Sequence, residues 1–537
     1  MPRKKQPARK LAVIDYETDP FLYGRIPAPF VAGFYELGNY LQFWGDDCVT
    51  QLIDYLNSRT DRLIIYAHNG GKFDFFFMLK YLENPLKVIS GRIAQCNLGI
   101  HELRDSYSII PIALGVYKKD TIDYQIMELE NREANKAEIS AYLKSDCVYL
   151  FELVDKFRDR FGDKLTIGAT AIADLQKFHP FESQNSGHDQ YFRPYYFGGR
   201  VECFESGIIK GDWKIYDVNS MYPDVMKRFK HPTGAKWLRM SDAKLTPKGN
   251  IAGRDADMYF AHIQCEQNGA FATRVKNEGL DFNVPSGEFW VTSHELKAAI
   301  DTGRVSNIKC LNVLIPYKTI SFGDFVDHHV AAKIVAKKQG DKVGELFAKF
   351  LLNSAYGKFG SNPENYFDYF IVADGGVEPD KPYRIYLQHE SGVTVWRKPA
   401  AMHKYFDVAT AASITGAARS VLLRGLSAGK RVVYCDTDSI ICESLPLALS
   451  ETVLGAWKLE ASGNTIAIAG KKLYALRNGK TPVKSASKGA ILTDTQIFGI
   501  ARGDVYHWQN MAPTFSLGNG VRFVDRKIQS RIKAKIA

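Results

Sequence analysis

Four carboxylates in the first 150 residues follow elements that could bring them together. Asp15 and Glu17 close a short apolar run, and alternate residues of a strand point to the same side. Asp74 follows a second apolar run, and Asp146 lies on a helical pattern with Tyr142 one turn earlier. Taken singly, each acid is better explained as a solvated loop carboxylate. As a set they would repel each other unless cations joined them. The set therefore predicts two hard divalent cations that activate water and stabilise the leaving oxygen of a phosphodiester.

A second group of acids lies further along the chain. Asp217 ends an expected strand just before a sharp turn, and Asp436 and Asp438 occupy the tip of an expected hairpin. An aspartate at a tight turn ordinarily serves the turn itself. Two aspartates between apolar strands cost more free energy, because little else in that segment neutralises their charge. If Asp217 and Asp438 meet, they can hold two Mg²⁺ ions, one activating a primer hydroxyl and one holding a triphosphate.

One helix face between these acids could bind a nucleotide. Lys349, Asn353 and Tyr356 stand at i, i+4 and i+7, so a lysine for phosphate and a tyrosine for a base share one side. The alternative is an ordinary amphipathic surface helix. The chain contains no Walker phosphate loop, HExxH motif or CxxC pair. A nucleotide site must therefore be built from carboxylates, metal and this helix.

Length and composition agree with a large enzyme that meets nucleic acid. The 537 residues (60.4 kDa) suggest about three or four domains. The hydrophobic fraction of 45% argues against a disordered chain or a small disulfide scaffold. We expect no membrane span and no signal peptide, and we expect the eight scattered cysteines to be free thiols. A net charge of +11 and a pI of about 9.0 favour a phosphate-rich partner.

These residues need strands and helices to position them. Apolar runs predict buried strands at 11–14 and 63–66, and the helical periodicity predicts helices over 74–81 and 133–160. A polar, turn-rich stretch at 179–190 suggests a domain boundary. The later expected elements are a strand at 213–218, a helix after Pro223, short strands and loops over 229–325, two helices over 324–359 broken near 340–341, irregular β-like structure over 360–404, a helix over 409–426 and a hairpin over 432–442.

In this order, the motifs resemble those of family B DNA polymerases with a 3′–5′ proofreading exonuclease, over nearly the whole chain. The exonuclease motifs DxE, NxxxFD and YxxxD stand at 15–17, 69–74 and 142–146. The polymerase motifs DxxSxYP, KxxxNSxYG, YxDTDS and KxY stand at 217–223, 349–357, 434–439 and 472–474. The ordered set is far more specific than any one member.

The runs at 66–74 and 216–223 look most like the polymerases of tectivirus-type bacteriophages, which belong to the protein-primed subgroup. Residues 196–199 are similar to the YxGG linker between the two modules. The long gaps between 217 and 349 and between 357 and 436 have room for the two insertions that mark this subgroup. By similarity, the first would bind a priming protein, and the second would close a collar that confers processivity and strand displacement.

The resemblance implies a role for each matching residue. The implied catalytic residues are Asp217, Asp436, Asp438, Asp15, Glu17, Asp74, Tyr142 and Asp146; all except Asp436 and Tyr142 are metal ligands, and Asp436 supports its site. The implied nucleotide-binding residues are Tyr222, as a steric gate against a ribose 2′-OH, with Lys349, Asn353, Tyr356 and Lys337. The implied DNA-binding residues are Asn69, Phe73, Ser106, Tyr124, Lys119, Tyr196, Gly198, Gly199, Ser220, Gly357, Thr415, Arg419, Lys472 and Tyr474. The spacing before Tyr124 is one residue longer than the family pattern, which leaves Lys118 and Lys119 open as the exonuclease lysine.

The resemblance also implies a fold class, α/β and α+β multidomain, with a ribonuclease-H-like exonuclease followed by a right-hand polymerase. The expected divisions are a basic arm (1–10), the exonuclease (11–185), the linker (186–200) and the polymerase domain (201–537). Within the polymerase domain we expect the palm at 201–228 and 405–495, the first insertion at about 229–325, the fingers at about 326–359, the second insertion at about 360–404 and a basic thumb at about 496–537.

The function implied is a replicative polymerase that starts on the hydroxyl of a terminal protein and displaces a strand. We expect two-ion Mg²⁺ sites in both modules, for which Mn²⁺ can substitute. The expected partners are primer-template and single-stranded DNA, dNTPs, a terminal protein and a single-stranded DNA-binding protein. We expect a monomer in the cytoplasm of an infected bacterium. The alternatives are a family B polymerase primed by nucleic acid, a DNA-binding protein without chemistry, against which the intact acids argue, and a nuclease alone, which leaves 217–474 unexplained.

Overall fold

The computed structural model of the chain describes residues 9–181, 186–276, 279–389, 392–400 and 407–530. The predicted basic arm lies outside these residues except for Arg9 and Lys10, as does the basic end of the chain beyond residue 530. Among the described residues, no helix is both long and apolar enough to span a membrane.

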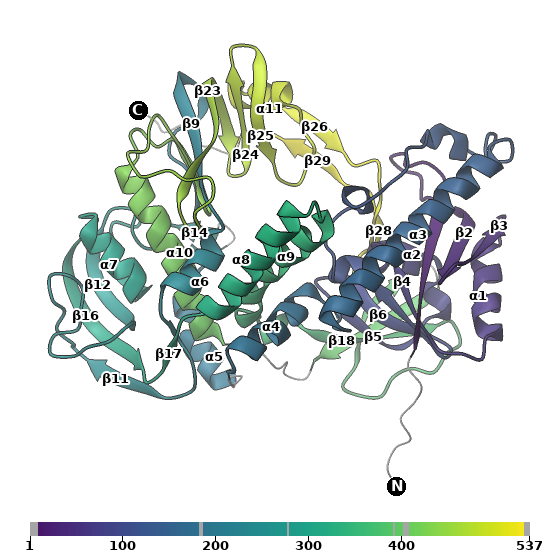
Figure 1. The fold of residues 1–537 in the computed structure, drawn as a ribbon, viewed down its shortest axis with the longest axis horizontal. Helices are drawn as coiled ribbons and strands as arrows, with labels where there is room; N and C mark the ends of the chain where they lie inside the picture. Colours follow the sequence, from purple (N-terminus) through teal and green to yellow (C-terminus); the bar gives the residue numbers. More distant parts are fainter. Residues whose placement is uncertain (1–8, 182–185, 277–278, 390–391, 401–406, 531–537) are drawn as a thin grey trace, which may run out of the picture.

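The N-terminal lobe is a ten-stranded sheet in the order β19-β20-β18-β5-β6-β7-β4-β1-β2-β3 (Figure 1). β1 runs parallel to β4, and β4 runs parallel to β7, whereas β2 and β3 are antiparallel. Its own strands are β1 (Lys10–Thr18), β2 (Pro29–Glu36), β3 (Asn39–Trp44), β4 (Leu63–Ala67), β5 (Glu83–Ile89), β6 (Arg92–Leu98) and β7 (His101–Asp105).

Helices cover the two faces of this sheet. α1 (Cys48–Ser58) packs on one face, and α3 (Lys136–Phe161) packs on the other through Ile139, Leu143 and Cys147. Gly33 of β2 lets α3 approach, because a Cβ there would lie 2.9 Å from the sulfur of Cys147. The predicted helix at 74–81 is only partly present, as α2 (Asp74–Phe77) followed by a 3₁₀ turn at Leu79–Tyr81.

Three strands from the 360–404 segment extend the N-terminal sheet. β18 (Phe367–Ala373), β19 (Arg384–His389) and β20 (Val393–Pro399) form a meander, and β18 pairs with β5. Asn84 fixes this junction with two 2.7 Å hydrogen bonds to the backbone of Ile371. The predicted β-like character is therefore confirmed, and the segment belongs to the sheet of the first lobe.

The centre of the second lobe is a seven-stranded sheet in the order β25-β24-β23-β9-β22-β21-β8. Its strands are β8 (Val201–Cys203), β9 (Gly207–Val218), β21 (Tyr434–Asp436), β22 (Ser439–Cys442), β23 (Trp457–Gly470), β24 (Leu473–Asn478) and β25 (Thr481–Ser487). The predicted hairpin at 432–442 is confirmed as β21 and β22. The sheet packs against α6 (Met221–Arg228) and α10 (Val408–Ala428).

Two antiparallel helices, α8 (Gly323–Lys338) and α9 (Lys342–Phe359), lie between the two lobes in Figure 1. The predicted break at 340–341 is confirmed, and Asp341 caps α9 through the backbone N–H of Gly344 at 2.9 Å. α4 (Ile167–Phe178) packs against α9. The end of the stretch at 179–190, predicted to be turn-rich, belongs to α5 (Ser186–Phe192), and residues 182–185 lie outside the described residues.

The 229–325 segment forms a separate four-stranded sheet, β11-β16-β12-β15, with one helix. The bounds are β10 (His231–Pro232), β11 (Trp237–Ser241), β12 (Phe260–Gln267), β13 (Thr273–Val275), β14 (Gly279–Asp281), β15 (Ser286–Thr292), α7 (Ser293–Asp301), β16 (Val305–Pro316) and β17 (Thr319–Ile320). The prediction of only short strands and loops is wrong for β16 and α7. Thr292 and Glu295 form a capping box at the start of α7, a sequence signal that locates this helix.

The C-terminal segment leaves the second lobe and reaches the first (Figure 1). It consists of α11 (Asp494–Arg502), β26 (Tyr506–Gln509), β27 (Thr514–Ser516), β28 (Gly520–Arg522) and β29 (Asp525–Ile528). Phe515 and Leu517 are buried in the core of the N-terminal lobe, where Phe515 meets Phe73 at 5.5 Å between ring centroids. The C-terminal end of the chain therefore packs against its N-terminal lobe.

Candidate active sites

The four N-terminal acids converge at the end of β1. Carboxylate oxygens of Asp15, Glu17 and Asp146 lie within 4.8 Å of one another. The two β1 acids point the same way because they are two residues apart in a strand, and Asp146 comes from the buried face of α3. Asp74 is buried at the start of α2, and its charge bears on that of Asp15. The structure thus brings together the four residues predicted to act as one set.

These acids lack a counter-charge that matches them. Burial and then the neighbouring Asp146 raise the pKa of Asp15 to about 7, and burial and then Asp15 raise the pKa values of Glu17 and Asp74 well above their usual range. Buried Oδ1 atoms of Asp74 and Asp146 have no hydrogen-bond partner among the described residues. Oxygen-only donors that are crowded, buried and unpartnered fit hard divalent cations.

Lys119 is the cation that faces this cluster. Its Nζ lies 3.7 Å from Oδ2 of Asp146 and 5.5 Å from the ring centroid of Tyr142. The hydroxyl of Tyr142 in turn lies 3.2 Å from that of Tyr124. Lys118 points elsewhere and binds Glu152 at 2.9 Å. Geometry therefore favours Lys119 where the sequence left both lysines open.

The second pair of acids meets at the junction of β9 and β22. Asp217 is the cross-strand partner of Ser439, and the N–H of Val218 donates to the carbonyl of Asp438 at 2.9 Å. Burial and then the charge of Asp217 raise the pKa of Asp438 to about 6. Lys458 on β23 lies 3.3 Å from Asp217 and partly offsets its charge. No motif singles out this lysine, so sequence reasoning missed it.

Asp436 has a different environment from Asp438. Both of its carboxylate oxygens accept hydrogen bonds from Nζ of Lys472, at 2.5 and 2.6 Å, and Oδ1 also accepts from the hydroxyl of Thr437. A carboxylate so well neutralised has less capacity for a cation. The ammonium of Lys472, predicted to hold primer DNA, is bound to Asp436 in this structure.

The nucleotide-binding candidates share one face of α9. Lys349, Asn353 and Gly357 are exposed there, and Tyr356 is half-buried. The ring of Tyr356 stacks on that of Tyr222 from α6, with centroids 4.0 Å apart and planes at 1°. Lys337 is exposed near the end of α8. The geometry brings the predicted tyrosines into direct contact.

Left-handed backbone geometry recurs at motif residues. Asn69, Ser220, Thr437 and Lys472 have φ angles of +65°, +48°, +60° and +59°. Residues with side chains rarely adopt this conformation, and it concentrates where a site must be held in one arrangement. The side chain of Asn69 is held by Arg92, whose Nη1 donates to its Oδ1 at 2.9 Å.

The linker packs directly against the hairpin tip. A Cβ on Gly199 would lie 2.9 Å from the side chain of Thr437, and the carbonyl of Arg200 accepts from the N–H of Thr437 at 2.7 Å. Gly198 is exposed, whereas Tyr196 is half-buried and packs against Gly360. These contacts position the loop that carries Asp436 and Asp438.

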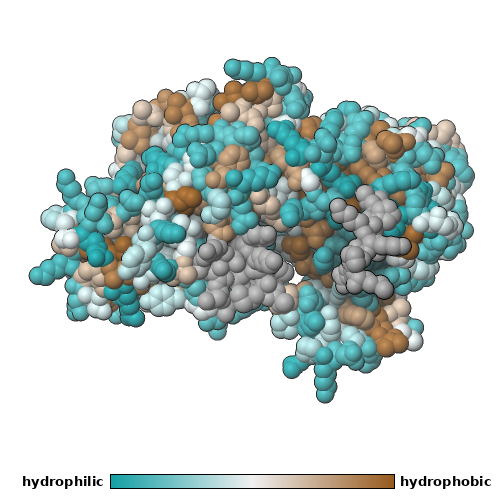
Figure 2. All heavy atoms as spheres, turned by 60° about the horizontal axis from the view of Figure 1, so that its bottom comes forward, coloured by the Kyte–Doolittle hydropathy of each residue, from teal (hydrophilic) through white to brown (hydrophobic). Residues whose placement is uncertain are grey.

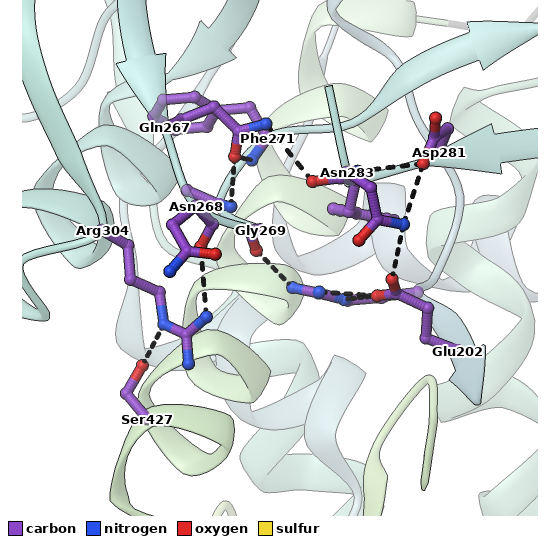
Figure 3. Close-up of polar contacts among 12 residues, drawn as sticks. Glu202, Gln267, Asn268, Gly269, Phe271, Asp281, Asn283, Arg304 and Ser427 are labelled. Carbon is purple, nitrogen blue, oxygen red and sulfur yellow. Dashed lines mark hydrogen bonds and ion pairs between the residues drawn. The ribbon is translucent and has the colours of Figure 1, made fainter. Parts of the chain in front are cut away.

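A polar network joins β8, the 229–325 segment and α10, as Figure 3 shows. Asn283 donates to Glu202 at 3.2 Å, and Glu202 accepts from Nε of Arg200 at 2.6 Å. Arg304 connects this sheet to α10, donating to the carbonyl of Asn268 at 3.1 Å and to the hydroxyl of Ser427 at 2.7 Å. The network anchors the 229–325 segment to β8 and α10.

Four residues predicted to contact DNA have little exposed surface in this structure. Ser106 is fully buried and hydrogen-bonds His68 at 2.9 Å, and Thr415 is buried with its hydroxyl on the carbonyl of Ala412. The other two are Arg419, 5% exposed and bound to Glu295 at 2.8 Å, and Tyr474, 6% exposed and packed on Tyr434. Arg419 also donates to the carbonyl of Gly198 at 2.9 Å, so it positions the linker.

Comparisons with known proteins agree with this geometry. The family model described as DNA polymerase type B, organellar and viral, matches residues 115–443. The chain is 44% identical to the DNA-directed DNA polymerase of Enterobacteria phage PRD1 over 98% of this chain and 100% of that one. It is 24% identical to the DNA polymerase of Bacillus phage phi29, covering 76% of this chain and 77% of that one.

Solved structures of phi29 DNA polymerase share the fold. The complex with single-stranded DNA superposes with a TM-score of 0.73, and the ternary complex with primer-template DNA and incoming nucleotide substrates with 0.74. Both are 18% identical and cover 98% of this chain and 100% of the other. The likeness confirms the predicted fold class. With the matching family model and the PRD1 relative, it follows that the chain belongs to the type B DNA polymerases of organelles and viruses.

Proposed function

We propose that this polymerase is replicative, degrades DNA 3′–5′ at the acids of β1, α2 and α3, and extends DNA at Asp217 and Asp438. The observation that carries the proposal is the presence of two separate carboxylate sites, each with half-buried or buried acids of raised pKa. Two-metal phosphoryl chemistry needs this kind of donor set. The PRD1 and phi29 relatives are named as DNA polymerases.

At the exonuclease site, Asp15, Glu17, Asp74 and Asp146 would hold Mg²⁺, for which Mn²⁺ can substitute. Bound there, the ions would supply an activated water and stabilise the leaving oxygen. The residues of the chain orient the reaction: Tyr142 stands beside Asp146, and Lys119 adds a positive charge next to it. Phe73, directly before Asp74, packs among Phe21, Phe77 and Phe515.

At the polymerase site, Asp217 and Asp438 would hold the ions, and bound there the ions would lower the pKa of the attacking hydroxyl and neutralise the triphosphate. Lys349 and Asn353 on α9 then face the nucleotide, while Tyr222 excludes a ribose 2′-OH and Tyr356 packs on the base. A cavity of about 940 Å³ lies between β23–β25 and the C-terminal segment. Five cations line it and suit the phosphates of duplex DNA: Lys471, Lys472, Lys488, Arg526 and Lys527.

The first testable consequence concerns the two neighbouring lysines. Lys119→Ala should lower the rate of single-strand degradation about 10- to 100-fold, as expected when a residue beside a metal ligand is lost. Lys118→Ala is the matched control and should leave the rate unchanged, because its side chain binds Glu152. Single-turnover digestion of a 5′-labelled oligonucleotide measures both. An equal loss in the two variants would contradict the assignment.

The second consequence is a pH dependence of stability in chelator-treated protein. Asp15 has a raised pKa of about 7 in the folded state, so its proton stabilises the fold at low pH and this contribution is lost as pH rises through about 7. Each such acid contributes a slope of roughly 1.4 kcal/mol per pH unit in that range. Thermal melts should therefore show stability falling from about pH 4 to 7 and levelling off above that, and Mg²⁺ should restore more stability at pH 8 than at pH 6. Asp15→Asn should flatten the slope, whereas the exposed control Asp155→Asn should not; parallel slopes would contradict the account.

We further propose initiation on a terminal protein, with the 229–325 segment as its docking region. The segment forms its own sheet and helix, fixed to the linker and α10 by the network in Figure 3. Incubation with the terminal protein, a labelled dNTP and Mg²⁺ should transfer label to that protein through a bond that survives boiling in detergent. Label only in DNA would favour ordinary nucleic-acid priming.

We also propose strand displacement, with the 360–404 strands acting as a collar. The support is that β18–β20 extend the exonuclease sheet and contact the C-terminal segment through Tyr386, which packs against Gly518. On a primed circular single-stranded template with Mg²⁺ and four dNTPs, products many times the circle length are expected without a helicase or clamp. Extension that stops after one circuit would contradict the collar. Such an enzyme would act as a monomer in the cytoplasm of an infected bacterium, with a single-stranded DNA-binding protein.

A further inference from the structure

The loop between β1 and β2 begins two residues after Glu17 and is closed at its neck. The N–H of Asp19 donates to the carbonyl of Ala28 at 3.2 Å, and the N–H of Ala28 returns a bond to Oδ2 of Asp19 at 3.3 Å. The other oxygen of Asp19 accepts from Arg132 at 2.5 Å. The loop ends are therefore fixed beside the exonuclease acids.

The middle of the loop is also held. Arg25 forms a bidentate ion pair with Glu128, at 2.8 and 3.0 Å, and donates to the carbonyl of Pro20. The N–H of Arg25 closes a turn on the carbonyl of Leu22 at 3.1 Å, with Gly24 in the left-handed region at φ +87°. A loop with this many polar ties presents its side chains in a defined arrangement.

The side chains that the loop presents are large and apolar. Phe21, Leu22, Tyr23 and Ile26 are 45%, 47%, 40% and 51% exposed. Hydrophilic side chains dominate the face shown in Figure 2, where hydrophobic ones form only small groups. Four exposed apolar side chains on one rigid loop indicate a surface that meets a partner.

The two aromatic rings lie at the junction of the exonuclease site and the C-terminal segment. The ring of Phe21 meets that of Phe73 edge-on at 5.7 Å, and Phe73 directly precedes the acid Asp74. The ring of Tyr23 meets that of Phe523 at 5.5 Å, and Phe523 directly follows the exposed Arg522. The rings therefore extend from the acids toward a cationic strand end.

We propose that Phe21 and Tyr23 form a stacking platform for the bases of an unpaired 3′ strand entering the exonuclease site. This inference rests on the exonuclease activity proposed above. Aromatic faces bind successive bases without regard to sequence, as a proofreading site requires, and Arg522 supplies charge for a phosphate. The occupant is a DNA strand because the platform is continuous with acids suited to phosphodiester chemistry.

Binding is tested on full-length protein carrying Asp15→Asn, with an oligonucleotide bearing 2-aminopurine near its 3′ end. Stacking quenches this fluorophore. Phe21→Ala and Tyr23→Ala should each raise Kd about 10-fold and reduce the quenching. Leu22→Ala, on the same loop and equally exposed, is the matched control and should bind as the parent does. Phe21→Trp should retain binding, whereas Phe21→Leu, which keeps apolar volume without a ring, should not.

Kinetics separate this role from the alternatives. In otherwise unchanged protein, Phe21→Ala should raise the KM for single-strand degradation with little change in kcat, and should leave extension of a matched primer unchanged. Full activity in Phe21→Leu, or an equal loss in Leu22→Ala, would overturn stacking in favour of an apolar surface for a protein. A parallel loss of matched-primer extension would overturn it in favour of a packing contact that holds the C-terminal segment. Failure of the unsubstituted protein to degrade DNA would instead refute the proposed exonuclease, while the fluorescence assay still reports whether the rings bind a strand.

Discussion

Replacing Asp438 with asparagine should abolish primer extension and leave single-strand degradation intact. The carboxylate is half of the acid pair at the junction of β9 and β22, and the substitution removes its charge at nearly constant volume. Loss of one electrostatic element at a phosphoryl-transfer centre lowers the rate on the order of 10³-fold or more. Extension of a labelled primer with a matched template, measured under single-turnover conditions, gives the size of the effect.

The control for this change lies on the same strand as Asp217. Asp212 of β9 is exposed and pairs only with Lys214 among the described residues, so Asp212→Asn should extend primers normally.

The melting temperature distinguishes misfolding of Asp438→Asn from a loss of chemistry. Burial and repulsion from Asp217 raise the pKa of Asp438, so its negative charge is unfavourable in the folded protein without metal. Removing that charge should not lower the melting temperature of chelator-treated protein. Normal extension by Asp438→Asn would contradict the assignment of the site.

The converse substitution, Asp15→Asn, should abolish degradation and spare extension. Asp15 shares the acid cluster with Glu17 and Asp146, and oxygens of these three lie within 4.8 Å of one another. Loss of one cation ligand from such a set should reduce degradation on the order of 10³-fold. Time courses on a 5′-labelled single strand without dNTPs measure this directly.

Asp155→Asn provides the matched control, because Asp155 is on α3 like Asp146 but is exposed. Degradation and extension of primers that end in a mismatch provide a second measurement. Asp15→Asn should leave them undegraded and largely unextended, whereas the control should trim and then extend them. If Asp15→Asn and Asp438→Asn each destroyed both activities, two independent sites could not be maintained.

Local patterns predicted most of the elements that carry the acids. The apolar runs at 11–14 and 63–66, the helix with Tyr142 and Asp146, and the hairpin with Asp436 and Asp438 all depend on short-range periodicity. The break between α8 and α9 follows from Gly340 and the capping residue Asp341 in the same way. α7 could also be predicted from the sequence, because Thr292 and Glu295 form the capping box at its start.

Long-range contacts account for what the sequence did not predict. Nothing near Asn84 indicates that its amide binds Ile371 and joins β18 to the first sheet. Similarly, the sequence alone does not indicate that the guanidinium of Arg419 binds Glu295 and the carbonyls of the linker. Periodicity predicts which face of an element is buried, but it does not indicate which distant residue covers that face.

The most direct test of the two-site account is the location of bound Mn²⁺ by anomalous scattering in a crystal of the full chain with primer-template DNA and a non-hydrolysable dNTP. We expect peaks at two places: among Asp15, Glu17, Asp74 and Asp146, and between Asp217 and Asp438. Asp436, neutralised by Lys472, should have no peak of its own. A single metal centre, or peaks away from both acid groups, would contradict the division of the chain into one extending and one degrading site.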